Sequence, residues 1–502
     1  MADTKREIER KYESDHSGLP DLTGVAGVAA VIDKGVTQLD ATYYDTEDER
    51  LAASSITLRR RTGGSDAGWH LKFPVSPGVR DEIQAPLSDR LPRTLAGLVR
   101  SRVRDTELLP VMRLRSDRDV RDLVDGDGRV LAEVSVDAVQ AERFGGDGGT
   151  AQWTEIEVEL ADGIDQGFLD KVEKRLKKAG VRPSSSASKL QRALDETGPK
   201  KKRGKKARVA RELVTAGDHV LLYVRTQRNA IVELDPAVRR DVYDSVHKMR
   251  VATRRMRSAF KSYGKVLDRA VTDPIGEELK WLAGELGVDR DQEVLTERLT
   301  AALDELPRTL LTGPVRTRLR TWSHARSGGS RRRLINVLDG KRYLDLLETL
   351  DALIADPPLL EAAGGKPEKV IRKAVRKDFS KVSGLVEQAL ELEPGHERDL
   401  GLHEARKKAK RARYSAESAV RALGDPASGL VKSMKSLQNL LGDHQDSVMT
   451  REALRDLARQ AHGAGEPSFT YGLLYGREER RAAEDEAELP GLWRDIKGGA
   501  GF

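Results

Sequence analysis

The spacing of apolar residues changes once along this chain, near residue 200, and that change limits the possible folds more than any other feature. Residues 1–160 alternate apolar and polar side chains in short runs, separated by turns such as TGGSDAG and DGDG. A period of two is typical of half-buried strands. From about residue 211 to residue 490 the apolar residues recur every three or four positions, as in amphipathic helices. The pattern predicts a multidomain α+β protein with the β-rich part first.

A basic segment lies between the two patterns. The sequence TGPKKKRGKKARVA, residues 197–210, contains a structure-breaking glycine and proline, and its lysines repel one another. A linker explains this composition better than a nuclear localisation signal does. We therefore predict a first domain over residues 1–196, a basic linker over 197–211 and an all-helical domain over 212–490. The helical spacing over residues 165–195 belongs to the first domain.

The two parts also differ in net charge. Residues 1–200 carry 31 Lys and Arg against 36 Asp and Glu, whereas the remainder has a net charge of +12. This excess predicts an anionic partner for the helical part without identifying it. The chain has no cysteine, which excludes disulfides, zinc–thiolate sites and cysteine nucleophiles. Its charged start does not resemble a signal peptide, and no apolar run reaches 18 residues. We therefore expect a cytoplasmic protein without a membrane span.

Carboxylates recur on one face of two predicted strands. In EIERK, a period of two places Glu7 and Glu9 on the same face as Lys11. In EIEVEL the three glutamates share one face, while Ile156 and Val158 point to the other side and predict a buried back. Adjacent carboxylates repel unless a cation lies between them, and oxygen donors of this kind suit Mg²⁺ or Mn²⁺.

Basic residues alternate in the same way on other predicted strands. Arg59 and Arg61 share a face, as do Arg113 and Arg115, and Lys72 lies in WHLKF. Acidic and basic strand faces together predict a closed barrel with a charged lumen. Such a lumen can bind a polyphosphate through its cations while its carboxylates hold metal ions. Each strand taken singly is also compatible with an antiparallel sheet that has one solvated face.

The helical part contains an internal repeat. VHKMRVATRRMRS at 246–258 aligns with LHEARKKAKRARY at 402–414, and LGVDRD at 286–291 aligns with LGDHQD at 441–446. Two matched landmarks at nearly the same offset predict two related helical bundles in tandem. A stripe of like charges along a helix is destabilising, so the stripes predict a bound polyanion, although salt bridges to acidic neighbours are the alternative. The stripe residues are His247, Arg250, Arg254, Arg257, Lys261, His403, Arg406, Lys407, Lys410 and Arg413.

These motifs resemble two known families. The ExExK start, followed in order by LRRR, HLK, RDE, MRLR, AEVSVD and EIEVEL, resembles the CYTH family of triphosphate tunnel metalloenzymes over about residues 5–195. The two basic repeats and their LG motifs resemble the CHAD family over about residues 212–490. The first resemblance implies an antiparallel eight-stranded β-barrel tunnel. The second implies an all-α domain of two repeated bundles that binds inorganic polyphosphate.

The CYTH resemblance also assigns roles by position. Lys11 would contact the substrate and help to orient the attacking water. Metal ions, Mg²⁺ or Mn²⁺, would be held by Glu7, Glu9, Glu155, Glu157 and Glu159. The phosphates of the substrate would be bound by Arg59, Arg61, Lys72, Arg113, Arg115 and Lys189.

The sequence therefore favours a metal-dependent triphosphatase, acting on inorganic triphosphate or a related organic triphosphate and tethered to a polyphosphate-binding module. Two alternatives stay open: a non-catalytic protein that binds polyphosphate granules, and an adenylate cyclase built on the same tunnel. A nucleic-acid partner is less favoured, because stacking aromatics and the helix-turn-helix and zinc-finger signatures are missing. The oligomeric state is left open.

Overall fold

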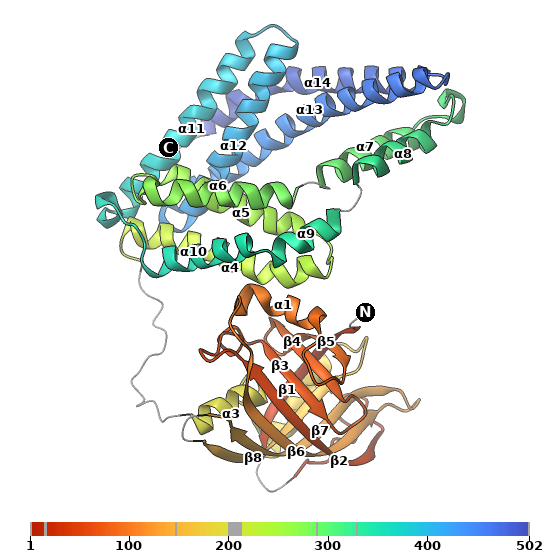
Figure 1. Cartoon of the computed structure of the whole chain (residues 1–502), viewed down its shortest axis with the longest axis vertical. Helices are drawn as coiled ribbons and strands as arrows, with labels where there is room; N and C mark the ends of the chain where they lie inside the picture. The colour runs from red at the N-terminus through yellow and green to blue at the C-terminus, as the bar shows by residue number, and fades with distance from the viewer. Residues whose placement is uncertain are drawn as a thin grey trace. The chain divides into compact units, whose positions relative to one another are not determined.

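The computed structural model describes residues 3–14, 18–145, 148–198, 213–287, 290–327 and 330–499. The chain divides into two units, residues 1–208 and 209–502 (Figure 1). Of the predicted linker, all but Thr197 and Gly198 lies outside the described residues. No described helix is long and apolar enough to cross a membrane.

The first unit is built on a closed ring of eight antiparallel strands, as the sequence predicted. Around the ring the order is β1, β5, β4, β3, β2, β6, β7 and β8, which pairs again with β1. A ninth, two-residue strand pairs with Tyr12 and Glu13. The strands are β1 (Asp3–Ser14), β2 (Ala30–Asp45), β3 (Thr57–Thr62), β4 (Gly68–Ser76), β5 (Val79–Pro86), β6 (Leu109–Val124), β7 (Val130–Arg143), β8 (Thr150–Leu160) and β9 (Arg182–Pro183).

Strand β1 closes the ring because its two halves pair with different neighbours. Residues 3–8 pair with β5 and residues 9–14 pair with β8, with Lys11 opposite Glu157. Alternation then separates the side chains of β1: the odd-numbered charged residues line the lumen, whereas Tyr12 faces outward. Tyr12 is fully buried there, against the apolar face of helix α2 (Gly167–Lys178).

Two further helices complete the first unit. Helix α1 (Arg93–Val103) covers the outer face of β3, β4 and β5 through Leu95, Leu98 and Val99. Helix α3 (Lys189–Thr197) packs Leu190 and Leu194 on apolar residues of β2, β6, β7 and β8. These residues point to the same side of their strands as the residues that line the lumen. One end of the lumen is therefore filled with apolar side chains, and α3 carries Lys189 at its first position.

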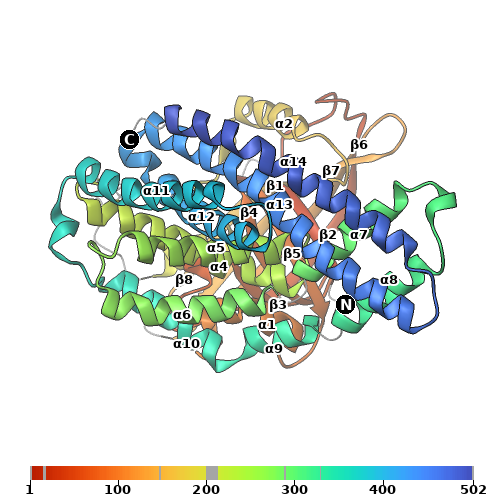
Figure 2. The ribbon, with the colours of Figure 1, turned by 90° about the horizontal axis from the view of Figure 1, so that it is seen from above.

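The second unit is all-helical and follows the predicted repeat. The helices are α4 (Ala216–Arg239), α5 (Ser245–Ser262), α6 (Arg269–Glu285), α7 (Arg290–Asp304), α8 (Val315–Ser327), α9 (Ser330–Asp339), α10 (Lys341–Ala355), α11 (Pro367–Glu391), α12 (His396–Leu423), α13 (Asp425–Gly463) and α14 (Phe469–Gly499). The repeated motifs lie on α5 and α12. The single helix α13 corresponds to both α6 and α7, and it packs along α14 (Figure 2).

The two repeats pack on each other around one hydrophobic core. That core takes apolar residues from α4, α5 and α6 and from α9 to α14. On α5, Met249, Met256 and Phe260 lie off the basic stripe and are buried. On α12 the buried positions that alternate with the stripe are small, with alanine at 405, 409 and 412. Small residues bring helices close together, and α12 packs against α5.

Candidate functional site

The lumen of the strand ring is a cavity of about 490 Å³ lined mainly by charged side chains. Neighbouring strands send both signs of charge into it, because alternation places every second residue of each strand inside. The charged residues lining the cavity are Lys5, Glu7, Glu9, Lys11, Lys34, Arg59, Arg61, Asp66, Lys72, Arg80, Glu82, Arg118, Asp122, Glu133, Glu157, Glu159 and Lys189.

Lys189 lies in a cage of three buried carboxylates. Its Nζ is 3.0 Å from Asp137 Oδ2, 2.9 Å from Glu155 Oε1 and 2.6 Å from Glu157 Oε1. Burial alone would lower the pKa of Lys189, but these three carboxylates raise it above its usual value. The helix start that carries Lys189 is fixed by Ser188, whose side chain accepts a hydrogen bond from the backbone N–H of Gln191.

A second set of charges surrounds Lys11. Its ammonium group contacts Glu157 and lies 3.3 Å from Glu9 Oε2. Burial tends to raise the pKa of Glu9, but the charge of Lys11 leaves that pKa below its usual value. The arrangement joins β1 and β8 through the pair of residues that the strand register places opposite each other.

Glu7 belongs to a third set, with Lys72 and Glu82. Lys72 Nζ lies 2.6 Å from Glu7 Oε2 and 3.5 Å from Glu82 Oε1. Burial, reinforced by the neighbouring charge of Glu82, raises the pKa of Glu7 to about 7. Glu159, the fifth predicted metal ligand, lies apart from these residues and pairs with Lys5 at 2.6 Å.

The acidic residues fit the divalent ion that the sequence implies. Asp137, Glu155 and Glu157 each offer a carboxylate oxygen, and these oxygens lie within 4.8 Å of one another. The ammonium group of Lys189 already shows that a cation is accommodated among them. A set of oxygen donors alone is the set that Mg²⁺ and Mn²⁺ prefer.

Two of the predicted phosphate-binding arginines face the lumen from β3. Arg59 hydrogen-bonds Tyr43 at 3.3 Å and lies 3.8 Å from Glu82 Oε1. Arg61 is 5% exposed and pairs with Asp66 of the loop after β3. Burial, reinforced by the charge of Arg59, lowers the pKa of Arg61 to about 9. The charge of Arg61 is therefore held at a cost that a bound anion would relieve.

The structure corrects the placement of Arg113 and Arg115. Both lie on the outer face of β6, where Arg113 forms two hydrogen bonds to Asp40, at 3.0 and 2.5 Å. In this part of β6 the residues that face inward are Met112 and Leu114, which are apolar and pack against α3. Neither arginine lines the tunnel.

Arg118 is the arginine that β6 sends into the lumen, and the sequence reasoning missed it. Its guanidinium forms two 2.8 Å bonds to Asp137 and one to Glu157. Arg118 lies four residues after Leu114 and therefore shares its face, but nothing in the sequence indicated that this apolar face points inward. Asp137 and Glu82 were not among the predicted site residues either, although both share a face with charged residues on their strands.

In the helical unit, four stripe residues come together across the two repeats. Arg250 and Arg254 of α5 act electrostatically on Lys410 of α12, as does Arg406 one turn away. Burial, reinforced by these three guanidinium groups, lowers the pKa of Lys410 to about 8. We call Arg250, Arg254, Arg406 and Lys410 the basic cluster.

Within the basic cluster, Arg406 lies 4.0 Å from Asp446. Other stripe residues pair more closely with acidic neighbours. Lys261 lies 3.1 Å from Asp273, Lys407 lies 2.6 Å from Glu404 on its own helix, and Arg413 lies 3.7 Å from Glu417. His247 is exposed, whereas Arg257 and His403 are half-buried. In the first LG motif, residues 288 and 289 lie outside the described residues.

Comparison with known proteins identifies both parts of the chain. A CYTH domain model matches residues 5–194, and a CHAD domain model matches residues 222–455. The uncharacterized proteins MT2285 and Rv2226 of Mycobacterium tuberculosis (strains CDC 1551 / Oshkosh and ATCC 25618 / H37Rv) are similar over nearly the whole length. Each is 38% identical over 506 residues, covering 98% of this chain and 96% of the relative.

Two solved structures also resemble the chain. PptA from Streptomyces chartreusis is 20% identical with a TM-score of 0.48, over 56% of this chain and 99% of that chain. The CHAD domain from the plant Ricinus communis is 24% identical with a TM-score of 0.39, over 56% of this chain and 89% of that chain. With both domain models matched in order and two relatives aligned from end to end, the chain belongs to the proteins in which a CYTH tunnel domain is followed by a CHAD domain.

Proposed function

We propose that the CYTH tunnel is a metal-dependent triphosphatase acting on inorganic triphosphate or a related organic triphosphate, and that the CHAD helices bind inorganic polyphosphate. One observation carries the first part: buried and half-buried cations from β1, β3, β4, β5, β6 and α3 share a single cavity with buried carboxylates. A lumen of this kind suits a polyanion that binds together with metal ions.

The chain's own residues would act by positioning and charge neutralisation. Arg59, Arg61 and Arg118 each offer a planar set of donors that matches phosphate oxygens, and Lys72 adds a compact charge. In the described structure these cations pair with carboxylates. Substrate phosphates would replace those carboxylates, which would then be available to a metal ion. Preorganised donors of this kind supply much of the stabilisation of a charged transition state.

Two groups have more specific parts in this proposal. The carboxylates of Glu9, Glu155 and Glu157, with Asp137, would hold Mg²⁺ or Mn²⁺, and a bound ion would neutralise charge on the phosphate oxygens and lower the pKa of a bound water. Lys11 lies between Glu9 and Glu157. From there its ammonium group can donate to an attacking water or to a phosphate oxygen, which would orient the nucleophile.

The test is phosphate release from triphosphate, ATP and thiamine triphosphate, with Mg²⁺ or Mn²⁺. We expect turnover of at least one substrate, and a loss of about 100-fold or more in Glu157→Gln. Glu142→Gln is the matched control, because Glu142 lies exposed on β7 with the parity opposite to that of the lumen residues. No phosphate from any substrate with either metal would contradict the triphosphatase. Cyclic AMP formed from ATP would instead favour the adenylate cyclase.

The basic cluster carries the second part of the proposal. Four cations held close enough to depress the pKa of Lys410 bear mutual repulsion that a phosphate polymer would relieve. Binding of long-chain polyphosphate should weaken strongly in Arg250→Glu and Arg406→Glu. Arg480→Glu is the control, since Arg480 is 83% exposed on α14 and pairs within its own helix. Equal weakening in all three variants would reject a local site. Binding that persists in Glu157→Gln without any turnover in the wild type would favour the non-catalytic alternative.

A further inference from the structure

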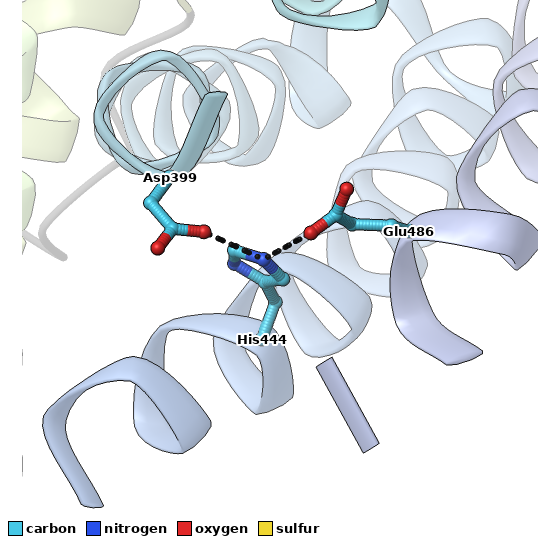
Figure 3. Close-up of side chains that lie close together, drawn as sticks. All are labelled: Asp399, His444 and Glu486. Atoms are coloured by element: carbon cyan, nitrogen blue, oxygen red, sulfur yellow. Dashed lines mark hydrogen bonds and ion pairs between the residues drawn. The ribbon is translucent and has the colours of Figure 1, made fainter. Parts of the chain in front are cut away.

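Two groups of side chains in the described part of the chain bring carboxylate oxygens close together, and their charges are neutralised in different ways. The group in the helical unit joins Asp399 of α12 and Glu486 of α14 to His444 of α13 (Figure 3). The outer oxygens of these two carboxylates are paired as well, since Arg451 lies 3.4 Å from Asp399 and Arg398 lies 2.9 Å from Glu486. Every carboxylate oxygen of this group therefore faces a basic side chain.

The group in the tunnel, Asp137, Glu155 and Glu157, contains one carboxylate that is held by an uncharged side chain. Glu155 Oε2 accepts a hydrogen bond of 2.6 Å from the indole N–H of Trp153. The other oxygen of Glu155, Oε1, is buried and accepts no hydrogen bond among the described residues, although the ammonium group of Lys189 lies 2.9 Å from it. Glu155 is therefore fixed at one oxygen, while the other oxygen can serve a cation.

Strand β8 places Trp153 and Glu155 side by side on its inward face. The two residues are two positions apart, so the alternation of the strand sends both side chains to the same side. Trp153 is 8% exposed and packs in the apolar end of the lumen together with Leu190 and Leu194 of α3. Its indole therefore lies where the apolar end meets the charged part of the lumen, with an apolar body and a polar N–H that reaches the first carboxylate.

Helix α3 fixes the indole ring from a second direction. The guanidinium of Arg192 lies over the ring of Trp153, 5.0 Å from its centre, and pairs at 2.8 Å with Glu196 one turn later on the same helix. A cation over the face of an indole is attracted by the π electrons of the ring. The same helix carries Lys189 into the carboxylate cage. It therefore supplies the cation of the cage and also holds the ring that orients Glu155.

We propose that Trp153 is a positioning residue of the tunnel, whose N–H holds Glu155 so that Oε1 is presented to a divalent metal ion. This inference rests on the proposed metal site that Glu155 forms with Asp137 and Glu157. An uncharged donor suits the role, because it fixes one oxygen without cancelling the negative charge that attracts the ion. The indole N–H can only donate a hydrogen bond, so it does not compete as a ligand. Partners that orient a metal ligand in this way contribute about 10- to 100-fold to metal affinity.

The experiment measures Mn²⁺ binding to the full chain by electron paramagnetic resonance, and binding that is lost in Glu157→Gln is assigned to the tunnel. Trp153→Phe keeps an aromatic ring but removes the N–H, and we expect Mn²⁺ to bind in the tunnel about 10- to 100-fold more weakly. Trp322→Phe is the matched control, because Trp322 is also buried and donates to Asp456 at 3.0 Å in the helical unit. This control should bind Mn²⁺ as tightly as the wild type.

A double-mutant cycle separates positioning from packing. If Trp153 acts through Glu155, Trp153→Phe should weaken Mn²⁺ binding little further in a chain that already carries Glu155→Gln. Additive losses would mean that Trp153 acts by packing under α3, and they would overturn the proposal. Equal Mn²⁺ affinity in Trp153→Phe and the wild type would overturn it too, while leaving the proposed triphosphatase intact. A wild type that binds no Mn²⁺ in the tunnel would instead remove the metal from the proposed function, and this inference with it.

If Trp153→Phe does not fold, the nuclear magnetic resonance signals of the indole N–H groups decide in its place. The chain has five tryptophans. Mg²⁺ should shift one indole N–H signal of the wild type, because a metal ion draws electron density from the carboxylate that accepts the hydrogen bond. The same signal should not shift in Glu155→Gln. A wild type in which Mg²⁺ binds but shifts no indole N–H signal would overturn the proposal.

Discussion

The guanidinium of Arg250 in α5 lies directly against the backbone of Gly287, just after α6. A methyl carbon built on that glycine would sit 2.7 Å from Cζ of the arginine. The second repeat shows the same relationship with more room, since a methyl carbon on Gly442 in α13 would sit 3.4 Å from Nη2 of Arg406. The glycine of each LG motif therefore makes room for an arginine of the basic cluster, and the two repeated motifs act as one unit.

This relationship predicts different effects for one substitution in the two repeats. In Gly287→Ala the new methyl group overlaps the guanidinium of Arg250, which must move because it is the flexible end of a side chain. Polyphosphate should then bind about tenfold more weakly, a change of about 1.4 kcal/mol. Gly442→Ala should bind nearly as the wild type, because 3.4 Å is a tolerable contact. Isothermal titration with a defined long-chain polyphosphate measures both. An equal loss in the two variants would contradict this account.

A second prediction contrasts two arginines of strand β6. Arg118→Gln removes the guanidinium that bonds Asp137 and Glu157 inside the tunnel, and we expect kcat/KM for triphosphate to fall about 100-fold. Arg113→Gln removes a pair with Asp40 on the outer face and should leave kcat/KM within about twofold, since exposed pairs contribute little. Steady-state phosphate release measures both. A large loss in Arg113→Gln alone would mean that the substrate binds outside the lumen.

Strand β6 also shows where the alternation of side chains no longer predicts which residues face the lumen. On β1 and β8, alternation alone gave the inward face, because Glu157 alternates with the apolar Ile156 and Val158 of the outer wall. On β6, Arg113 alternates with Leu114. If the whole lumen were polar, Arg113 would be expected to face inward and Leu114 outward. The lumen is not polar along its whole length, because α3 fills one end with Leu190 and Leu194. No pattern within β6 itself reveals a plug supplied by a distant helix.

In the helical part, too, the sequence predicted features within one helix but not the contacts between helices. Spacing along each helix was enough to predict the two basic stripes. It could not predict which stripe residues meet, since that depends on how α5 packs on α12. Lys410 belongs to the basic cluster, whereas Lys407 pairs with Glu404. This difference between the two lysines is visible only in the packed structure.

A third prediction concerns the pH dependence of polyphosphate binding. Lys410 has a pKa of about 8, lowered by burial and by the nearby guanidinium groups, so it loses its proton between pH 7 and pH 9. A bound polyanion favours the charged form, so binding takes up a proton and affinity should fall as the pH rises through 8. We expect up to about tenfold per pH unit above the pKa. Lys410→Arg stays charged and should show a flatter profile. Titration in both proteins checks this, and parallel profiles would exclude Lys410 as the titrating group.

A fourth prediction concerns the stability of the tunnel when its buried lysine is removed. Lys189→Met leaves Asp137, Glu155 and Glu157 without their shared cation, at exposures of 0%, 2% and 8%. Removing one partner from a buried group of paired charges lowers the free energy of unfolding by about 3–5 kcal/mol. In the wild type the raised pKa of Lys189 makes its contribution constant at any pH well below 10.5, its unfolded value.

The variant should respond to pH and to metal in ways the wild type does not. Lys189 is one of the cations that hold the pKa values of Asp137 and Glu157 below their usual range, so in the variant these two carboxylates bind protons at a higher pH than in the wild type. The deficit in unfolding free energy should therefore shrink as the pH falls into the range where these carboxylates become protonated. Added Mg²⁺ or Mn²⁺ should also reduce it, because a divalent ion can take the place of the ammonium group. Urea denaturation of the full chain at several pH values, with and without metal, measures these effects. A deficit in unfolding free energy that changes with neither pH nor metal would show that Lys189 acts only by filling space under α3.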